Sequence, residues 1–525
     1  MSSTKLVAFA SLLFILFYNR SFFQHVLLVY PLSWKNIGFL LSLSLGVTLT
    51  IALFITLLAS KYTTKPVIIL LFVLSSFSIY FMDKYNVVID YVMIKNILQT
   101  DYEETYDLLT LRMLCYFIAF GAVPSIFVYK LRIEKSSLKK SVLFKLRDIS
   151  VICVVIFLLL FSFSRFYTSF FREHKELRYY VNPIYYVYSF WKYADKEIFV
   201  RKKKLVPIGL DAAVEPHEKK KIVIFVVGEA ARADHFSLNG YKKITNPLLA
   251  KEGVASFSNV SSCGTSTAYS VPCMFSLFSR AEFDSGKGEE YENLLDLLQH
   301  TGSVDVLWRD NNSDSKGVAV RVPHQDYKSS ALNTICADGE CRDEGMLVGL
   351  DQYIAQHASN DILIVLHQMG NHGPAYYKRY PKEFAKFTPA CLTNELEECS
   401  ADEIINAYDN ALLYTDYFLK KVIDFLKKYD PSHDVALLYF SDHGESLGEN
   451  GVYLHGIPYI IAPEAQTHIG AVMWFGSHLQ KKLDMKELAK HKNKKYSHDN
   501  IFHTLLGLFH VQTNLYEKQL DMLVP

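Results

Sequence analysis

Net charge is almost absent from this sequence. Its 55 lysines and arginines are balanced by 54 aspartates and glutamates, which leaves a formal charge of +1 at pH 7. Proteins that bind nucleic acid usually carry a clear excess of basic residues, so we expect no nucleic-acid partner. Internal repeats and low-complexity segments are also lacking, and no feature of the chain predicts a protein partner. A length of 525 residues is enough for two or three domains.

Long apolar runs are confined to residues 1–165, whereas residues 200–525 have the composition of a soluble globular domain. A membrane-spanning helix needs about 20 apolar residues, and five runs meet this requirement. The small-residue cleavage site that marks a removed signal peptide is lacking after the first run, so we expect a retained helix there. The five predicted spans lie near residues 7–30, 38–59, 66–82, 112–129 and 149–165.

Charges in two connecting loops predict how these spans are oriented. Residues 130–147, between the fourth and fifth spans, carry seven basic residues and one acidic residue. Residues 83–110, between the third and fourth spans, carry six acidic residues and two lysines. Because cytoplasmic loops are enriched in lysine and arginine, we expect a cytoplasmic N-terminus and an extracytoplasmic location for everything after residue 165.

Residues 166–220 connect the apolar part of the chain to the polar part. Aromatic residues are dense in 166–192, and aromatic rings favour the membrane–water interface. We therefore predict an interfacial helix there, with ordinary helical packing on the polar part as the alternative, and a linker over 201–220. The predicted domains are a transmembrane domain of residues 1–165, an interfacial helix and linker of residues 166–220, and an extracytoplasmic domain of residues 221–525.

Short apolar runs alternate with helix-like stretches from residue 221 onward. The runs are rich in β-branched and aromatic residues, and polar residues follow each of them directly. This alternation predicts an α/β domain with a mostly parallel sheet that is covered by helices on both faces. Ligands bind outside the carboxyl ends of the strands in such sheets. The predicted strands are Ile222–Val227, Val304–Trp308, Ile362–Leu366, Ala436–Phe440 and Ala471–Phe475.

Candidate metal ligands follow three of these predicted strands. Glu229 follows the first, His372 lies in the loop after the third, and Asp442 and His443 follow the fourth, with His455 later in the same loop. An acidic residue at a strand end is usually a helix cap or a turn former. Carboxylates and imidazoles that converge from separate strands are instead typical of a site for zinc or another divalent ion.

A hydroxyl-rich segment, Ser261–Thr267, precedes a stretch with helical character that reaches Phe278. Such a segment is commonly a helix N-cap. A hydroxyl at a helix N-terminus also lies beside free N–H groups that can hold phosphate oxygens. Metal coordination activates a hydroxyl that is otherwise a poor nucleophile.

Six cysteines lie outside the predicted spans, in pairs that are close in sequence. Six cysteines allow fifteen pairings, so spacing alone does not decide the connectivity. A CxxC motif is lacking, which argues against metal thiolates, and three local disulfides are the simplest interpretation. Disulfides require an oxidising compartment, in agreement with the predicted topology. The cysteines are Cys263 and Cys273, Cys336 and Cys341, and Cys391 and Cys399.

Five motifs together resemble the lipid A phosphoethanolamine transferases, which include the mobile colistin-resistance enzymes and have an alkaline-phosphatase/sulfatase-like fold. The resemblance extends through nearly the whole chain, in the order of five spans, linker and catalytic domain. Ala230 stands where threonine is commonest in the first motif, but this position is not a ligand position. The motifs are Gly228–His235, Asn239–Tyr241, Ser262–Thr267, Val271–Met274 and Ser441–Glu449.

The resemblance implies one catalytic zinc, and it leaves a second zinc open. The implied ligands are Glu229, Thr265, Asp442 and His443, and Thr265 is also the implied nucleophile. Lys316, His372 and His455 are implied to act in catalysis beside it. The implied substrate contacts are Ser313 and Lys316 at the phosphate, and Asn96, Thr100 and Glu104, which share one helix face, at the lipid headgroup.

The implied reaction moves phosphoethanolamine from phosphatidylethanolamine to a phosphate of lipid A or lipopolysaccharide. A phosphothreonine intermediate forms, diacylglycerol is released, and the surface loses negative charge, which weakens the binding of polymyxin and other cationic peptides. The implied location is the Gram-negative inner membrane, among membrane lipids, with the catalytic domain in the periplasm.

Several other functions share some of these features. The same metal site could transfer phosphoethanolamine to a core sugar or a protein. It could also serve a membrane-anchored phosphodiesterase or phosphatase. A sulfatase needs Cys or Ser followed by x-Pro-x-Arg, and Cys263–Thr267 lacks both the proline and the arginine. The Gly-Glu-x-x-Arg motif and the cysteine pairs argue against a glycerol-phosphate polymerase. A receptor without enzymatic activity has no use for a reactive threonine beside a metal.

Overall fold

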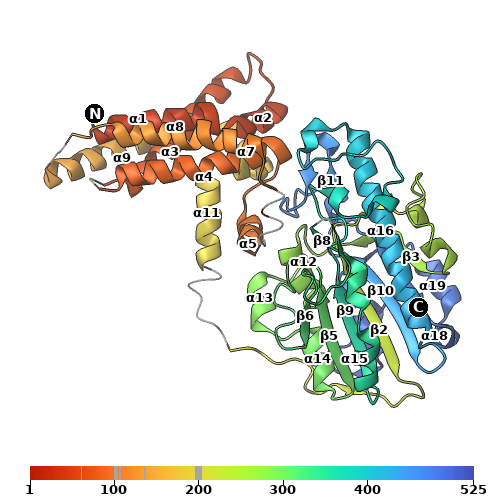
Figure 1. Cartoon of the computed structure of the whole chain (residues 1–525). Helices are drawn as coiled ribbons and strands as arrows, with labels where there is room; N and C mark the ends of the chain where they lie inside the picture. Colours follow the sequence, from red (N-terminus) through yellow and green to blue (C-terminus); the bar gives the residue numbers. More distant parts are fainter. Residues whose placement is uncertain are drawn as a thin grey trace. The chain divides into compact units, whose positions relative to one another are not determined.

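A computed structural model describes residues 1–60, 62–99, 105, 108–134, 137–195, 204–337 and 339–524 (Figure 1). The chain forms two compact units. The first comprises Met1–Ile94 and Leu109–Asp195 and is helical, and the second comprises Lys95–Leu108 and Lys196–Pro525 and contains the large sheet.

Three helical segments of the first unit are each long and apolar enough to cross a membrane. They are α3 (Ile37–Leu58), α4 (Thr64–Tyr85) and the continuous segment Leu111–Lys130. That last segment contains a π-helical stretch, Phe117–Ala122, between α7 (Leu111–Tyr116) and α8 (Val123–Lys130).

Two further helix pairs reach the length of a span only when both members are counted. Ser3–Tyr18 and Arg20–Val29 meet at 62°, and Lys139–Ser162 and Ser164–Phe171 meet at 93°. By length and composition, the described residues therefore contain three candidate spans, or up to five if each bent pair is one span. The helices concerned are α1 (Ser3–Leu13), α2 (Arg20–Val29), α9 (Leu138–Ser162) and α10 (Ser164–Glu173).

Buried Asn19 accounts for the bend in the first pair. Its side-chain amide donates hydrogen bonds to the carbonyl oxygens of Phe14 at 2.9 Å and Asn182 at 2.8 Å. A carbonyl left without its helical partner needs such a donor in an apolar environment. Asn19, which interrupts the first apolar run in the sequence, thus stabilises the break between the two helices.

The aromatic segment after residue 165 packs within the first unit. Tyr167, Phe170 and Tyr180 are buried in one cluster with Phe22 and Phe39. Side-chain burial of this kind accounts for the high aromatic content of the segment. Its regular elements after α10 are the 3₁₀ helix Lys175–Tyr180 and α11 (Ile184–Tyr193).

A seven-stranded sheet forms the centre of the second unit, with the order β3-β13-β10-β2-β9-β5-β6. Four neighbouring pairs are parallel, and β13 is antiparallel to both of its neighbours. All five predicted strands are present in it. The strands are β2 (Lys221–Gly228), β3 (Ala255–Phe257), β5 (Val304–Asp310), β6 (His324–Asp326), β9 (Asp361–His367), β10 (Asp434–Ser441) and β13 (Ala471–Phe475).

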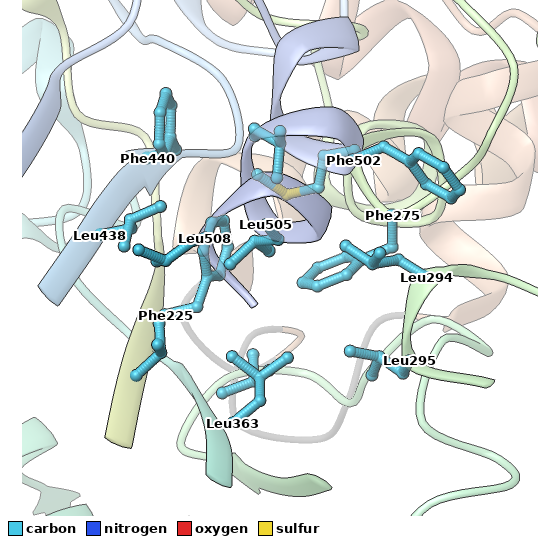
Figure 2. Close-up of a cluster of buried hydrophobic side chains, with 14 of the residues drawn as sticks. Phe225, Phe275, Leu294, Leu295, Leu363, Leu438, Phe440, Phe502, Leu505 and Leu508 are labelled. Atoms are coloured by element: carbon cyan, nitrogen blue, oxygen red, sulfur yellow. The ribbon is translucent and has the colours of Figure 1, made fainter. Parts of the chain in front are cut away.

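Helices cover both faces of this sheet, as the near-continuous apolar strands predict. Alternate residues of β2 belong to different buried clusters, with Phe225 on one face and Ile224 on the other. Figure 2 shows the first cluster, in which Phe225 and Phe440 are joined by side chains of α20 (Asp499–Leu508) and, farther across the cluster, of α14 (Leu294–His300). The opposite face is covered by α15 (Leu350–Gln356) and the long helix α16 (Ala401–Lys427).

Shorter elements surround the sheet. Four two-stranded sheets pair β1 with β15, β4 with β14, β7 with β8 and β11 with β12. These strands are β1 (Ala213–Val214), β4 (Val260–Ser261), β7 (Cys336–Ala337), β8 (Glu340–Cys341), β11 (Ser446–Leu447), β12 (Tyr453–Leu454), β14 (Tyr496–Ser497) and β15 (Val511–Gln512). The other helices are α5 (Tyr91–Gln99), α12 (Thr267–Met274), α13 (Ser285–Glu290), α17 (Glu464–Thr467), α18 (Ser477–Lys482) and α19 (Met485–His491).

Lys221, at the first position of β2, predicts an unusual pH dependence of stability. Its side chain is buried, its ammonium has no hydrogen-bond partner among the described residues, and burial lowers its pKa from 10.5 to about 8. The unfolded chain binds more protons than the folded chain between these values, so stability rises with pH there, by about 3 kcal/mol in total. Below pH 8 Lys221 is protonated in both the folded and the unfolded chain, so the whole free-energy cost of burying its charge is present.

Lys221→Met is therefore expected to raise the stability of the second unit at pH 7. The difference in stability between variant and parent should shrink as the pH approaches 10.5. The measurement is the thermal unfolding midpoint of parent and variant in detergent at several pH values. Subtracting the parent removes the contributions of other groups. A difference between the two proteins that is constant with pH would contradict the assignment.

Candidate active site and metal centre

Neighbouring strands place three predicted ligands together. Gly228 at the end of β2 pairs with Ser441 at the end of β10, so the residues that follow them are adjacent. Glu229, Asp442 and His443 are fully buried, and one ligand atom from each lies within 4.8 Å of the others. The parallel strands thus bring two carboxylates and an imidazole to one edge of the sheet.

The hydrogen bonds of His443 indicate that a cation belongs between these groups. Its Nδ1 lies 2.8 Å from the Gly444 carbonyl oxygen and must carry a proton to bond it. Burial, and after it the neighbouring His455, lower the pKa of His443 well below its ordinary value, so the ring is neutral. The lone pair of Nε2 then faces Glu229 Oε1 and Asp442 Oδ2, each at 3.4 Å. Three lone pairs facing one another repel unless a cation lies among them.

Asp442 supports the same conclusion. Its Oδ1 accepts hydrogen bonds from the backbone N–H groups of Ala230 and His443, whereas its Oδ2 accepts none from any residue that the structure describes. Burial raises the pKa of Asp442 to about 6, which reflects the cost of an anion there. A divalent ion would offset that cost, and this set of two carboxylates and one imidazole suits zinc.

The structure brings Thr267, and not the predicted Thr265, into contact with the candidate ligands. Thr267 begins α12 and donates a hydrogen bond to Glu229 Oε2 at 3.2 Å, and its hydroxyl lies 3.4 Å from His443 Nε2. Thr265 instead donates to the carbonyl oxygen of Ile457 at 2.7 Å, away from the ligand cluster. The reason is the start of the helix, because Thr267 is its first residue and Thr265 lies two residues before it.

The segment after β5 reaches the same cluster. The side-chain amide of Asn312 donates to Glu229 Oε2 at 2.9 Å and to the Gln368 carbonyl oxygen at 2.8 Å. Ser313 donates its hydroxyl to Asn312 Oδ1 at 3.0 Å, and the Lys316 ammonium donates to the Ser313 carbonyl oxygen at 2.7 Å. Both predicted phosphate contacts therefore lie close to the ligands. Sequence reasoning missed Asn312, although the residue directly precedes Ser313.

The two predicted histidines also gather here. The His455 ring centroid lies 4.3 Å from that of His443 and 5.9 Å from that of His372. Glu445 holds His455 through a 2.8 Å contact to Nδ1. His443, Glu445 and His455 form a second group whose ligand atoms lie within 4.8 Å of one another. Glu445 is a further residue that sequence reasoning missed, and its only signal was the Ser441–Glu449 motif.

The three predicted headgroup contacts fall in α5 or after it. Asn96 is half-buried in α5, and Thr100 and Glu104 lie outside the described residues. The first of three disulfides encloses Thr267, because it joins the residues on either side of the start of α12. The disulfides are Cys263–Cys273, Cys336–Cys341 and Cys391–Cys399.

Comparison with known proteins identifies the family. The model of the phosphoethanolamine transferases EptA/EptB matches residues 47–198, and the sulfatase model matches residues 221–511. The phosphatidylethanolamine transferase Mcr-2 of Escherichia coli is 46% identical over 508 residues, which cover 94% of this chain and 92% of the relative. The chain belongs to the phosphoethanolamine transferases.

Two more phosphoethanolamine transferases extend the comparison. EptA of Escherichia coli K12 is 39% identical over 514 residues, covering 96% of this chain and 93% of the relative. The solved lipooligosaccharide phosphoethanolamine transferase A of Neisseria meningitidis, an integral membrane protein, superposes with a TM-score of 0.94 at 34% identity, covering 99% of this chain and 98% of that one. The fold predicted for this phosphoethanolamine transferase, apolar helices followed by a sulfatase-like α/β domain, is confirmed.

Proposed function

We propose that this transferase moves phosphoethanolamine from phosphatidylethanolamine to a phosphate of lipid A through a phosphorylated Thr267. The observation that carries the proposal is the position of the Thr267 hydroxyl, at a helix start and against two candidate ligands. Free N–H groups at the start of α12 offer donors to phosphate oxygens. Thr265, the residue implied by the motif alone, has its hydroxyl turned toward Ile457.

Glu229, Asp442 and His443 would hold a zinc ion, and the group His443, Glu445 and His455 offers a place for a second. A zinc ion bound there would lower the pKa of a nearby hydroxyl and would place positive charge beside the phosphoryl oxygens. The donor chemistry and the convergent lone pairs described above support this choice of ligands. Whether one or two ions bind is decided by metal analysis.

The first half of the reaction joins Thr267 to the donor lipid. The Thr267 oxygen forms a bond to phosphorus, and the bond between phosphorus and the diacylglycerol oxygen breaks. Glu229 Oε2 already accepts the hydrogen bond of this hydroxyl and is placed to hold its proton. His455, positioned by Glu445, is placed to supply a proton to the departing diacylglycerol oxygen.

The second half of the reaction restores Thr267. An oxygen of the acceptor phosphate attacks the phosphorus, the bond to Thr267 breaks, and the threonine hydroxyl recovers its proton. Lys316, whose ammonium donates to the Ser313 carbonyl oxygen, is placed to offset charge on the transferred group. The added ammonium group reduces the net negative charge of lipid A and with it the attraction of polymyxin and other cationic peptides.

The relatives support both substrates. Mcr-2 is a phosphatidylethanolamine transferase, which favours phosphatidylethanolamine as the donor. The Neisseria meningitidis relative is a lipooligosaccharide phosphoethanolamine transferase, which favours the lipid A portion of such a glycolipid as the acceptor. The loop charges favour an inner-membrane protein with a periplasmic catalytic domain, because the strongly basic loop belongs on the cytoplasmic side.

Mass spectrometry of lipid A tests the proposal. Gram-negative cells that express the chain are expected to contain lipid A with the mass increment of phosphoethanolamine, and cells with an empty vector are not. Detection of the protein in the membrane fraction controls for expression. Unmodified lipid A beside a well-expressed chain would exclude this acceptor.

A further inference from the structure

Six consecutive apolar residues lie on the surface beside the active site. Residues 458–463 have the sequence Pro-Tyr-Ile-Ile-Ala-Pro, and none of the six is buried. Ile460 is 85% exposed, more than any other large hydrophobic residue described in the second unit. A run of this length that is left on a protein surface is a folding liability unless it meets an apolar partner. We call this run the 458–463 loop.

The 458–463 loop is held firmly against the segment that carries Thr267. The Gly456 N–H donates to the Thr265 carbonyl oxygen at 2.7 Å, and the Thr265 hydroxyl donates to the Ile457 carbonyl oxygen at 2.7 Å. Within the loop, the Tyr459 hydroxyl donates to the Ser262 carbonyl oxygen at 2.9 Å. The exposed Ile460 therefore lies in a loop that is hydrogen-bonded to the segment carrying Thr267.

A cation lies at the base of the loop. The guanidinium of Arg280, an exposed residue, stacks over the Tyr459 ring at 3.9 Å from its centroid. Arginine and tyrosine beside exposed aliphatic side chains are typical of protein surfaces at the membrane–water interface. Arginine there meets lipid phosphates while the aliphatic groups enter the hydrocarbon. The loop thus combines an apolar tip with a charge that complements lipid headgroups.

We propose that the 458–463 loop inserts Ile460 into the acyl region of the bilayer, with Arg280 at the level of the lipid phosphates. The inference rests on the proposed function, because both substrates are lipids whose phosphorus must reach Thr267. Contact between this loop and lipid brings the nucleophile segment to the depth of the phosphates. The residues concerned lie outside the ligand cluster.

Fluorescence quenching tests the contact directly. Full-length Ile460→Trp is reconstituted into nanodiscs that contain phosphatidylcholine with brominated acyl chains, and the emission of the parent protein is subtracted. Ile244→Trp is the matched control, because Ile244 is also an exposed isoleucine (64%) in another segment of the same unit. Quenching at 460 and not at 244 is expected. Equal quenching at both positions, or none at 460, would overturn the proposal.

A kinetic experiment separates this inference from the proposed function. Ile460→Asp is expected to lower the rate of transfer from phosphatidylethanolamine in nanodiscs at least about tenfold, since a charge cannot enter the hydrocarbon at low cost. Cleavage of the water-soluble 4-nitrophenyl ester of phosphoethanolamine should be unchanged, and Ile244→Asp should resemble the parent in both assays. Equal losses in both reactions for Ile460→Asp would overturn the proposal. If the parent itself carries out neither reaction, the proposed function fails, and the quenching result alone decides the inference.

Discussion

Thr267→Ala is expected to abolish phosphoethanolamine transfer, with a loss of at least about a thousandfold in rate, because it removes the attacking oxygen. Thr265→Ala removes one hydrogen bond to a backbone carbonyl oxygen and should keep activity within about tenfold of the parent. Each variant loses the same atoms relative to the parent, and the two positions are two residues apart in one segment. The assay is transfer from phosphatidylethanolamine to purified lipid A.

Trapping the intermediate makes this comparison sharper. When the acceptor is omitted, peptides from the parent protein should carry phosphoethanolamine on Thr267, and peptides from Thr267→Ala should carry none. Thr267→Ser keeps a hydroxyl and is expected to retain part of the activity. The assignment would be wrong if Thr265→Ala lost all transfer while Thr267→Ala remained active.

Asp442→Asn is expected to remove the catalytic metal and to change stability in opposite directions with and without metal. Loss of an anionic ligand should reduce bound zinc and lower the transfer rate at least about a hundredfold. In metal-free protein, however, the variant should be more stable than the parent, because Glu229 and Asp442 then no longer place two negative charges in one buried site. The measurements are elemental analysis of the purified protein and thermal unfolding before and after chelation.

Asp343→Asn is the matched control for this effect. Asp343 is also buried, but it accepts hydrogen bonds from the Asn311 side chain and the Met369 N–H. Its replacement should destabilise the protein by the same amount whether or not metal is present. Equal zinc contents in Asp442→Asn and the parent would show that these residues do not form the metal centre.

The pattern of the strands explains why so much of the ligand cluster could be predicted. Parallel strands end at one edge of a sheet, so Glu229 after β2 and Asp442 after β10 were expected at the same edge, and the pairing of β2 with β10 makes them neighbours. Buried strands also have a strong sequence signal, since they are continuous apolar runs with polar residues directly behind them. The ligands that lie furthest along loops depend on how each loop folds.

The proposed nucleophile could not be placed from the same pattern. Thr265, Ser266 and Thr267 are three hydroxyl residues in a row, and only the start of α12 decides which of them faces Glu229. Helix boundaries are uncertain by one or two residues in any sequence-based argument. Asn312 was missed for a related reason, because an amide that supports a ligand has no distinctive spacing of its own. The bend at Asn19, in contrast, coincides with a polar interruption that is visible in the sequence.

The disulfide Cys263–Cys273 has a consequence for when the enzyme becomes active. The bridge encloses the start of the helix that carries Thr267. During synthesis, a chain that still faces the reducing cytoplasm keeps both thiols free, so this segment lacks its covalent constraint. Under the proposed topology, the segment that carries the proposed nucleophile gains this constraint only after export, and we expect full transfer activity only then.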